Sequence, residues 1–134
     1  MDSYALEISN LKKVYSGGTE ALKGISLKVK EGDFYALLGP NGAGKSSTIG
    51  IIGTLVTKTE GNVKIFGYDI DENVAVAKSL LGVVSQEINF SQFEKIIDIV
   101  TTQAGFYGIS NSIAKPKVEE MLRRLGLWLS LIHI

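Results

Sequence analysis

Residues 38–47 read LGPNGAGKSS, and positions 39–46 match the pattern G-x-x-x-x-G-K-[ST]. Glycines allow the backbone to curl until several N–H groups point at one anion. Gly42 and Gly44 also omit the side chains that would block the approach of that anion. This stretch therefore predicts a loop that binds the phosphate groups of a nucleotide.

The segments on both sides of the loop agree with this prediction. Before it, residues 34–38 are apolar throughout (FYALL), which is typical of a strand buried on both faces of a sheet. After it, KSSTIGIIGTL places Ile49, Ile52 and Leu55 at the spacing of one helix face. A helix that begins at the loop presents its positive end and its unpaired N–H groups to the same anion.

Two side chains of the loop suit a triphosphate with Mg²⁺. Lys45 supplies an ammonium for the β- and γ-phosphates, and the Ser46 hydroxyl is an oxygen ligand of the kind that Mg²⁺ prefers. The alternative is a glycine-rich turn that caps a helix and carries an incidental lysine. The strand before the loop and the helix after it favour the nucleotide site.

Composition limits the class of protein. The 134 residues suit one domain, and 14 basic against 14 acidic residues give no net charge that would favour nucleic acid as a partner. There is no cysteine, which excludes disulfides and thiol chemistry. The start MDSYALEISN is not a secretory signal, and no apolar run approaches the roughly 18 to 20 residues of a membrane helix.

The remainder of the first two thirds predicts short elements. Alternating apolar residues predict strands at Tyr4–Ile8 and Ile25–Val29. A short helix capped by Asp71 and stopped by Gly82 is expected next, followed by an apolar strand at residues 83–84 that leads to Gln86.

From Ser91 onward the pattern becomes helical. One helix is predicted to end at Gly108, and a second carries the pairs Glu119–Arg123 and Glu120–Arg124. The second helix begins either at Pro116 or near Ser112 with a bend. The inner faces are predicted from apolar spacing, at Phe93, Ile96, Ile97, Val100, Ala104 and Tyr107 in the first helix and Val118, Met121, Leu122 and Leu125 in the second.

Longer stretches resemble one known family. LKKVYSGGTEALKGISLKVKEGDFYALLGPNGAGKSSTIGIIGTL (11–55), GNVKIFGYDI (61–70), LGVVSQE (81–87) and YGIS (107–110) are similar, in order and spacing, to the ATP-binding subunit of ABC transporters. The resemblance covers residues 2 to about 128 and is greatest to the ATPases of type-2 exporters.

The resemblance implies an α/β fold. We expect an incomplete P-loop NTPase (ABC ATPase) core with an antiparallel β subdomain in residues 1–86, and the start of the helical subdomain in 87–128. The last six residues, LSLIHI (129–134), fit neither the family nor a helix end. They read as the translation of a sequencing adapter, so we expect a truncated gene fragment with a non-native tail.

The resemblance also implies site residues. Tyr15 matches the aromatic that stacks on adenine, although by itself it also fits a half-buried strand tyrosine. Gln86 matches the glutamine that reaches Mg²⁺ and the attacking water, and Ser46 is the other Mg²⁺ ligand. Lys45 and Gln86 are the implied catalytic residues. The implied nucleotide-binding loop comprises Gly39, Pro40, Asn41, Gly42, Ala43, Gly44, Lys45, Ser46 and Ser47, with serine at position 47 where threonine is usual.

The implied partners are a membrane permease subunit and a second ATPase subunit, with the protein cytoplasmic and peripheral on the inner face of the plasma membrane. Phe90 and Phe93 are candidate permease contacts, or else core residues. Alternatives are a fragment of a soluble ABC ATPase of translation or DNA repair, and a non-catalytic nucleotide-binding fragment.

Three elements that the family uses for turnover have no counterpart in this sequence: an LSGGQ-like signature, an apolar strand ending in Asp-Glu, and a switch histidine. The single histidine, His133, has no such context and is read as incidental. We therefore expect this chain to bind ATP and Mg²⁺ without measurable hydrolysis.

Overall fold

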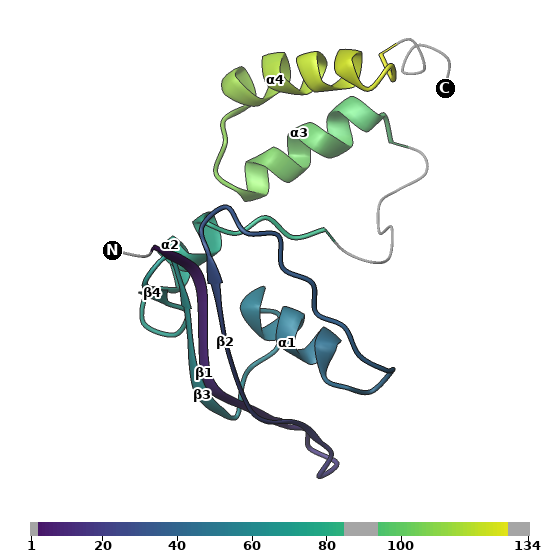
Figure 1. Cartoon of the computed structure of the whole chain (residues 1–134). Coiled ribbons are helices and arrows are strands. Elements are labelled where there is room, and N and C mark those ends of the chain that lie inside the picture. Colours follow the sequence, from purple (N-terminus) through teal and green to yellow (C-terminus); the bar gives the residue numbers. More distant parts are fainter. Residues whose placement is uncertain (1–2, 85–93, 129–134) are drawn as a thin grey trace. The chain divides into compact units, whose positions relative to one another are not determined.

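The structure is a computed structural model that describes residues 3–84 and 94–128 (Figure 1). The chain divides into two compact units, Met1–Val84 and Ser85–Ile134. The first unit contains a sheet and two helices, and the second contains a pair of helices. No helix within the described ranges is long and apolar enough to cross a membrane.

The sheet of the first unit has four strands, β1 (Tyr4–Val14), β2 (Glu20–Lys30), β3 (Glu60–Ile65) and β4 (Tyr68–Asp69). Their order is β2-β1-β3-β4, and every neighbouring pair is antiparallel. The two strands predicted from alternation are confirmed, and both extend further than the pattern indicated. This sheet is the antiparallel part of the expected α/β fold.

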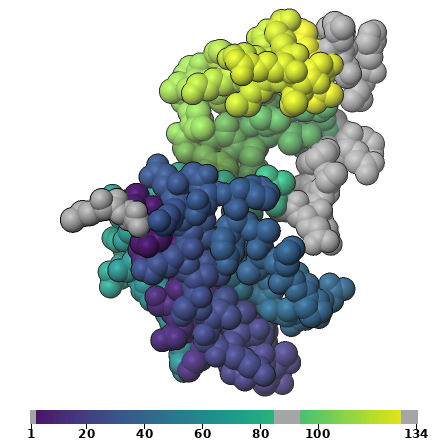
Figure 2. Space-filling model, viewed as in Figure 1, coloured from purple at the N-terminus to yellow at the C-terminus, as the bar shows by residue number. Residues whose placement is uncertain are grey.

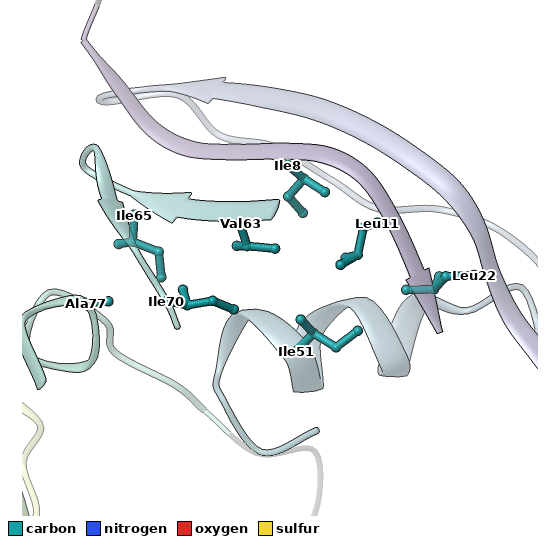
Figure 3. Close-up of a cluster of buried hydrophobic side chains, with 8 residues drawn as sticks. All are labelled: Ile8, Leu11, Leu22, Ile51, Val63, Ile65, Ile70 and Ala77. Atoms are coloured by element: carbon teal, nitrogen blue, oxygen red, sulfur yellow. The ribbon is translucent and has the colours of Figure 1, made fainter. Parts of the chain in front are cut away.

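The core of the first unit lies between the sheet and helix α1 (Lys45–Ile52). Figure 3 shows Ile51 on the side of α1 that faces the strands, and this side chain is only 1% exposed. Burying such side chains stabilises the unit by about 1.5 to 3 kcal/mol each. The cluster thereby fixes α1, and the loop that precedes it, against the sheet. Its members are Ile8, Leu11, Leu22, Ile51, Val63, Ile65, Ile70 and Ala77.

The prediction of a buried strand at residues 34–38 is wrong. Phe34 is 99% exposed and Leu38 89% exposed, and the segment has no strand partner among the described residues. A strand buried on both faces needs hydrogen-bonded neighbours and a covering layer on each face. The described strands pair with one another instead, so this apolar segment runs along the surface. The strand predicted at residues 83–84 is wrong for the same reason, because Val84 is 98% exposed.

Helix α1 forms where predicted, and Ile52 of the predicted inner face packs against the core, but the rest of that face is not buried. Thr48 and Ile51 are buried, whereas Ile49 and Leu55 are exposed. The helix ends at Ile52, so Leu55 lies outside it. Three isoleucines within four positions give no apolar contrast between the two faces, which explains the error.

Helix α2 (Val74–Ser79) begins later and ends earlier than the predicted caps require. The residue before it is Asn73, without a side-chain cap hydrogen bond, and Leu80 follows its end. The Asp71 carboxylate instead lies 2.8 Å from the Lys58 ammonium. Both predicted caps, Asp71 and Gly82, are therefore wrong.

The second unit pairs helices α3 (Ile96–Phe106) and α4 (Asn111–Arg124). Gly108, with φ of +74°, follows the end of α3 as predicted. Pro116 lies inside α4, which begins at Asn111, so the earlier of the two predicted starts is confirmed.

The buried residues of this helix pair include Thr101, Ala114, Val118 and Leu122. Val118 and Leu122 are buried as predicted, whereas Met121 and Leu125, also predicted to face inward, are exposed. The predicted pairs are confirmed, with Glu119–Arg123 at 2.8 Å and Glu120–Arg124 at 2.6 Å.

Candidate nucleotide-binding site

The glycine-rich loop leads directly into α1. The helix begins at Lys45, and Gly44 before it has a left-handed backbone with φ of +83°. The Ala43 N–H donates to the Pro40 carbonyl at 3.2 Å, and the Thr48 N–H donates to the Gly44 carbonyl at 2.9 Å. The predicted junction of loop and helix is therefore present at the predicted residue. Figure 2 shows the blue segment that carries residues 34–47 at the surface of the first unit.

The two glycines singled out from the sequence serve different purposes. A Cβ on Gly44 would lie 2.5 Å from both the Ala21 carbonyl oxygen and the Leu22 Cδ2 atom of β2. Gly44 therefore allows close packing of the loop on the sheet. Gly42 also has positive φ, +84°, but nothing lies within 4 Å of its Cβ position. Only Gly42 leaves open space, which fits the predicted approach of an anion.

The ammonium of Lys45 contacts the loop that precedes it. It donates hydrogen bonds to the Gly39 carbonyl at 2.5 Å and the Pro40 carbonyl at 2.6 Å. An ammonium has three donors, so one remains for a ligand. These contacts hold the positive charge at the N-terminus of α1, where an anion is favoured.

Ser46 and Ser47 occupy the first turn of α1. The Ser46 hydroxyl is on an exposed residue, and oxygen donors of this kind fit Mg²⁺. Among the described residues there is no group of three or more histidines, cysteines or acidic residues that would hold a metal. Mg²⁺ often takes only one or two protein ligands and completes its coordination with substrate phosphates and water. The residues present therefore fit a Mg²⁺ ion that arrives with a nucleotide.

Tyr15 lies beside the loop although it is distant in the sequence. Its hydroxyl oxygen is 3.0 Å from the Ser47 Oγ atom. Strand β1 ends at Val14, so Tyr15 directly follows the strand, and its side chain is 40% exposed. The structure thus brings the predicted base-stacking residue to the end of the predicted phosphate loop.

Sequence reasoning missed Lys13. Its ammonium lies 4.8 Å from the centre of the Tyr15 ring and donates to the Thr57 carbonyl at 2.6 Å. The available signal was the spacing of two between Lys13 and Tyr15 at the end of a strand, which places alternate residues on the same side.

Three ionisable side chains of the sheet have shifted pKa values. The hydrogen bond to Glu60 raises the pKa of Lys12, and the hydrogen bond to Glu7 raises the pKa of Lys28. The Asp71 N–H, helped by the Asn62 side chain, lowers the pKa of the Asp69 carboxyl below its ordinary value.

Several predicted residues fall outside the described ranges. They are Gln86, Phe90, Phe93 and His133. Their implied roles stay predictions.

Comparison with known proteins identifies the family. The sequence profile of the ABC transporter family matches residues 22–132. The chain belongs to the ABC transporter family. Both the family and the α/β fold implied by the resemblance are confirmed.

Relatives of this ABC protein include subunits with different transport roles. It is 39% identical over 122 residues to the linearmycin resistance ATP-binding protein LnrL of Bacillus subtilis (strain 168), covering 91% of this chain and 39% of the relative. It is 32% identical to the daunorubicin/doxorubicin resistance ATP-binding protein DrrA of Streptomyces peucetius, covering 92% and 37%. It is 30% identical to the phosphonates import ATP-binding protein PhnC 2 of Oceanobacillus iheyensis, covering 91% and 53%.

Solved structures of the family share the fold. An ATP-binding subunit of an ABC transporter matches with a TM-score of 0.80 and 25% identity, over 97% of this chain and 55% of that one. The ATP-binding cassette MJ0796, solved as a dimer in a post-hydrolysis state with ADP and Pi, matches with a TM-score of 0.73 and 28% identity, over 88% and 56%. The chain thus spans about two fifths to a little over half of the length of these proteins.

Proposed function

We propose that this chain is the ATP-binding part of an ABC transporter ATPase. Residues 39–47 hold the phosphates, Lys45 neutralises their charge and Tyr15 stacks on the base. The observation that carries the proposal is the placement of Lys45 at the start of α1, beside a loop with open space at Gly42. The binding of ADP and Pi by a structural neighbour supports it.

Mg²⁺ is the proposed second cofactor, with Ser46 and Gln86 as its protein ligands. When bound, the ion neutralises phosphate charge. We propose that the transporter ATPase of which this chain is the ATP-binding part hydrolyses ATP, with Lys45 and Gln86 as the proposed catalytic residues within this stretch.

The proposed partners are a membrane permease and a second ATPase subunit, at the cytoplasmic side of the membrane. A dimeric structural neighbour supports the second subunit. For direction we propose export, supported by the resistance relatives, one of which is 39% identical over 91% of the chain. Import relatives exist as well, so the direction needs a test of its own. In cells with and without the gene, lower drug accumulation when the gene is present is the expected result, and equal accumulation contradicts export.

Nucleotide binding is tested by titrating the chain with a fluorescent ATP analogue in the presence of Mg²⁺. Lys45→Ala is expected to weaken binding about 10- to 100-fold, since a hydrogen bond to a charged group contributes about 1.5 to 3 kcal/mol. Lys23→Ala, which removes an exposed lysine of β2, is the matched control and should bind as the unmodified chain does. Equal affinity of the Lys45→Ala variant and the unmodified chain contradicts the proposal.

A further inference from the structure

Hydrogen bonds hold both the backbone and the side chain of Tyr15. Its backbone N–H donates to the Thr19 carbonyl at 3.0 Å, and its own carbonyl accepts from the Gly18 N–H at 2.8 Å. Its hydroxyl contacts Ser47 at 3.0 Å. Tyr15 is thus held at its backbone and at its hydroxyl. These contacts do not determine which way the two faces of the ring point.

Lys13 meets one of these faces. Its ammonium lies over the ring, 4.8 Å from the centre, and is itself fixed by the Thr57 carbonyl at 2.6 Å. Thr57 belongs to the segment between α1 and β3, so the lysine is held by a part of the chain that lies far from it in sequence. A cation in this position is attracted by the ring face and disfavours rotation of the ring away from it.

We propose that Lys13 is a positioning residue for the nucleotide base: it occupies one face of Tyr15 and leaves the opposite face for the adenine ring. This inference rests on the proposed function, because it requires that Tyr15 stacks on a base. A ring that is already oriented loses less freedom when the base binds, and preorganisation of this kind raises affinity.

A phosphate-binding role for Lys13 does not fit the same contacts. The ammonium of Lys45 is bonded to the Gly39 and Pro40 carbonyls of the loop, whereas that of Lys13 is bonded to Thr57 and lies on the Tyr15 ring. The two lysines therefore serve opposite ends of a nucleotide. Removing Lys13 should therefore weaken only a ligand that carries a base, whereas removing Lys45 should weaken every ligand that carries the phosphates.

The chain offers a matched control for Lys13. Lys28 lies 4.7 Å from the centre of the Tyr4 ring and pairs with Glu7 at 2.8 Å. It makes the same kind of cation–ring contact on the same sheet, but both of its partners belong to β1. Lys28→Met thus removes an equivalent contact without touching the proposed site.

The test is calorimetric titration of the full chain with Mg-ATP and with inorganic tripolyphosphate, which has no base. Lys13→Met should weaken ATP binding about two- to fivefold, as expected for a cation–ring contact at an exposed site, and leave tripolyphosphate binding unchanged. Lys13→Arg should restore most of the ATP affinity. Lys28→Met should change neither ligand. Equal weakening of both ligands, unchanged ATP affinity or tighter ATP binding by Lys13→Met would each overturn the proposal.

A second measurement keeps this inference separate from the proposed function. Lys45→Ala should weaken both ligands, and if the unmodified chain binds neither, the proposed function fails. The position of Lys13 is then read by NMR in the ligand-free chain. Its side-chain methylene protons should carry a ring-current shift that disappears in Tyr15→Leu, and protons that do not move in that variant would overturn the positioning role.

Discussion

The hydroxyls of Tyr15 and Ser47 lie 3.0 Å apart across 32 positions of sequence. One hydroxyl belongs to the residue proposed to stack on the base, and the other to the first turn of α1, behind the phosphate loop. This hydrogen bond links the two ends of the proposed nucleotide site. It also fixes the end of β1 to the start of α1.

Breaking this link should weaken ATP binding. Tyr15→Phe keeps the ring for stacking and loses the hydrogen bond, which contributes about 0.5 to 1.5 kcal/mol, so the affinity should fall about two- to tenfold. With Ser47→Ala, the double variant should bind ATP no more weakly than the weaker single variant. Tyr68→Phe, which alters an exposed tyrosine of β4, is the control. Titration of all four variants checks this, and strictly additive losses would contradict it.

Gly44→Ala should destabilise the fold. The substitution places a Cβ at positive φ and 2.5 Å from β2, and together these cost about 2 to 4 kcal/mol. Gly18→Ala is the control, because Gly18 has φ of +78° with nothing within 4 Å, and it should cost only about 1 kcal/mol. Urea unfolding measures both. Equal losses would mean that the contact with β2 does not constrain position 44.

Gly42→Ala should have a small effect on stability and a large effect on nucleotide binding. Nothing lies within 4 Å of the added Cβ, so stability should fall by only about 1 kcal/mol, from the positive φ alone. The methyl group would instead fill space proposed for the phosphates, and Mg-ATP affinity should fall at least tenfold. Titration at a temperature well below the unfolding midpoint separates the two effects. Unchanged affinity would place the phosphates elsewhere.

The predictable parts of the site depend on local chemistry. Gly44 and Lys45 lie where expected because a left-handed glycine followed by a helix start is encoded within a few residues. Alternation predicted only the parts of β1 and β2 that lie away from Tyr15, at Tyr4–Ile8 and Ile25–Val29. Family resemblance supplied Tyr15 itself, which no local pattern would separate from an ordinary strand tyrosine.

The wrong predictions concern residues whose packing partners come from distant parts of the sequence. The sequence of residues 34–38 shows that the segment favours burial, yet burial depends on neighbouring strands, and the described sheet supplies none for it. The face of α1 was misjudged because Ile49, Ile51 and Ile52 are equally apolar. Lys13 was missed because its meaning depends on Thr57, which only the folded chain brings near.

Asp69 should make the stability of the first unit depend on pH. The carboxylate is 9% exposed and accepts the Asp71 N–H at 2.8 Å, and it also accepts a hydrogen bond from the Asn62 amide. These contacts lower the pKa of Asp69 in the folded state below its ordinary value of 3.8. The folded pKa is therefore lower than the unfolded one. The contribution of Asp69 to stability is complete above about pH 4 and is lost as the pH falls through the folded pKa.

Replacing this carboxylate should remove its share of the pH dependence. Asp69→Asn should be less stable than the unmodified chain at pH 6, because the charge-assisted hydrogen bonds are lost. As the pH falls from about 4 to 2, the free energy of unfolding should decline less steeply in the variant, so the two stabilities converge. Urea unfolding at intervals across this range measures both slopes. Parallel curves over the whole range would show that the Asp69 carboxylate is not stabilised by folding.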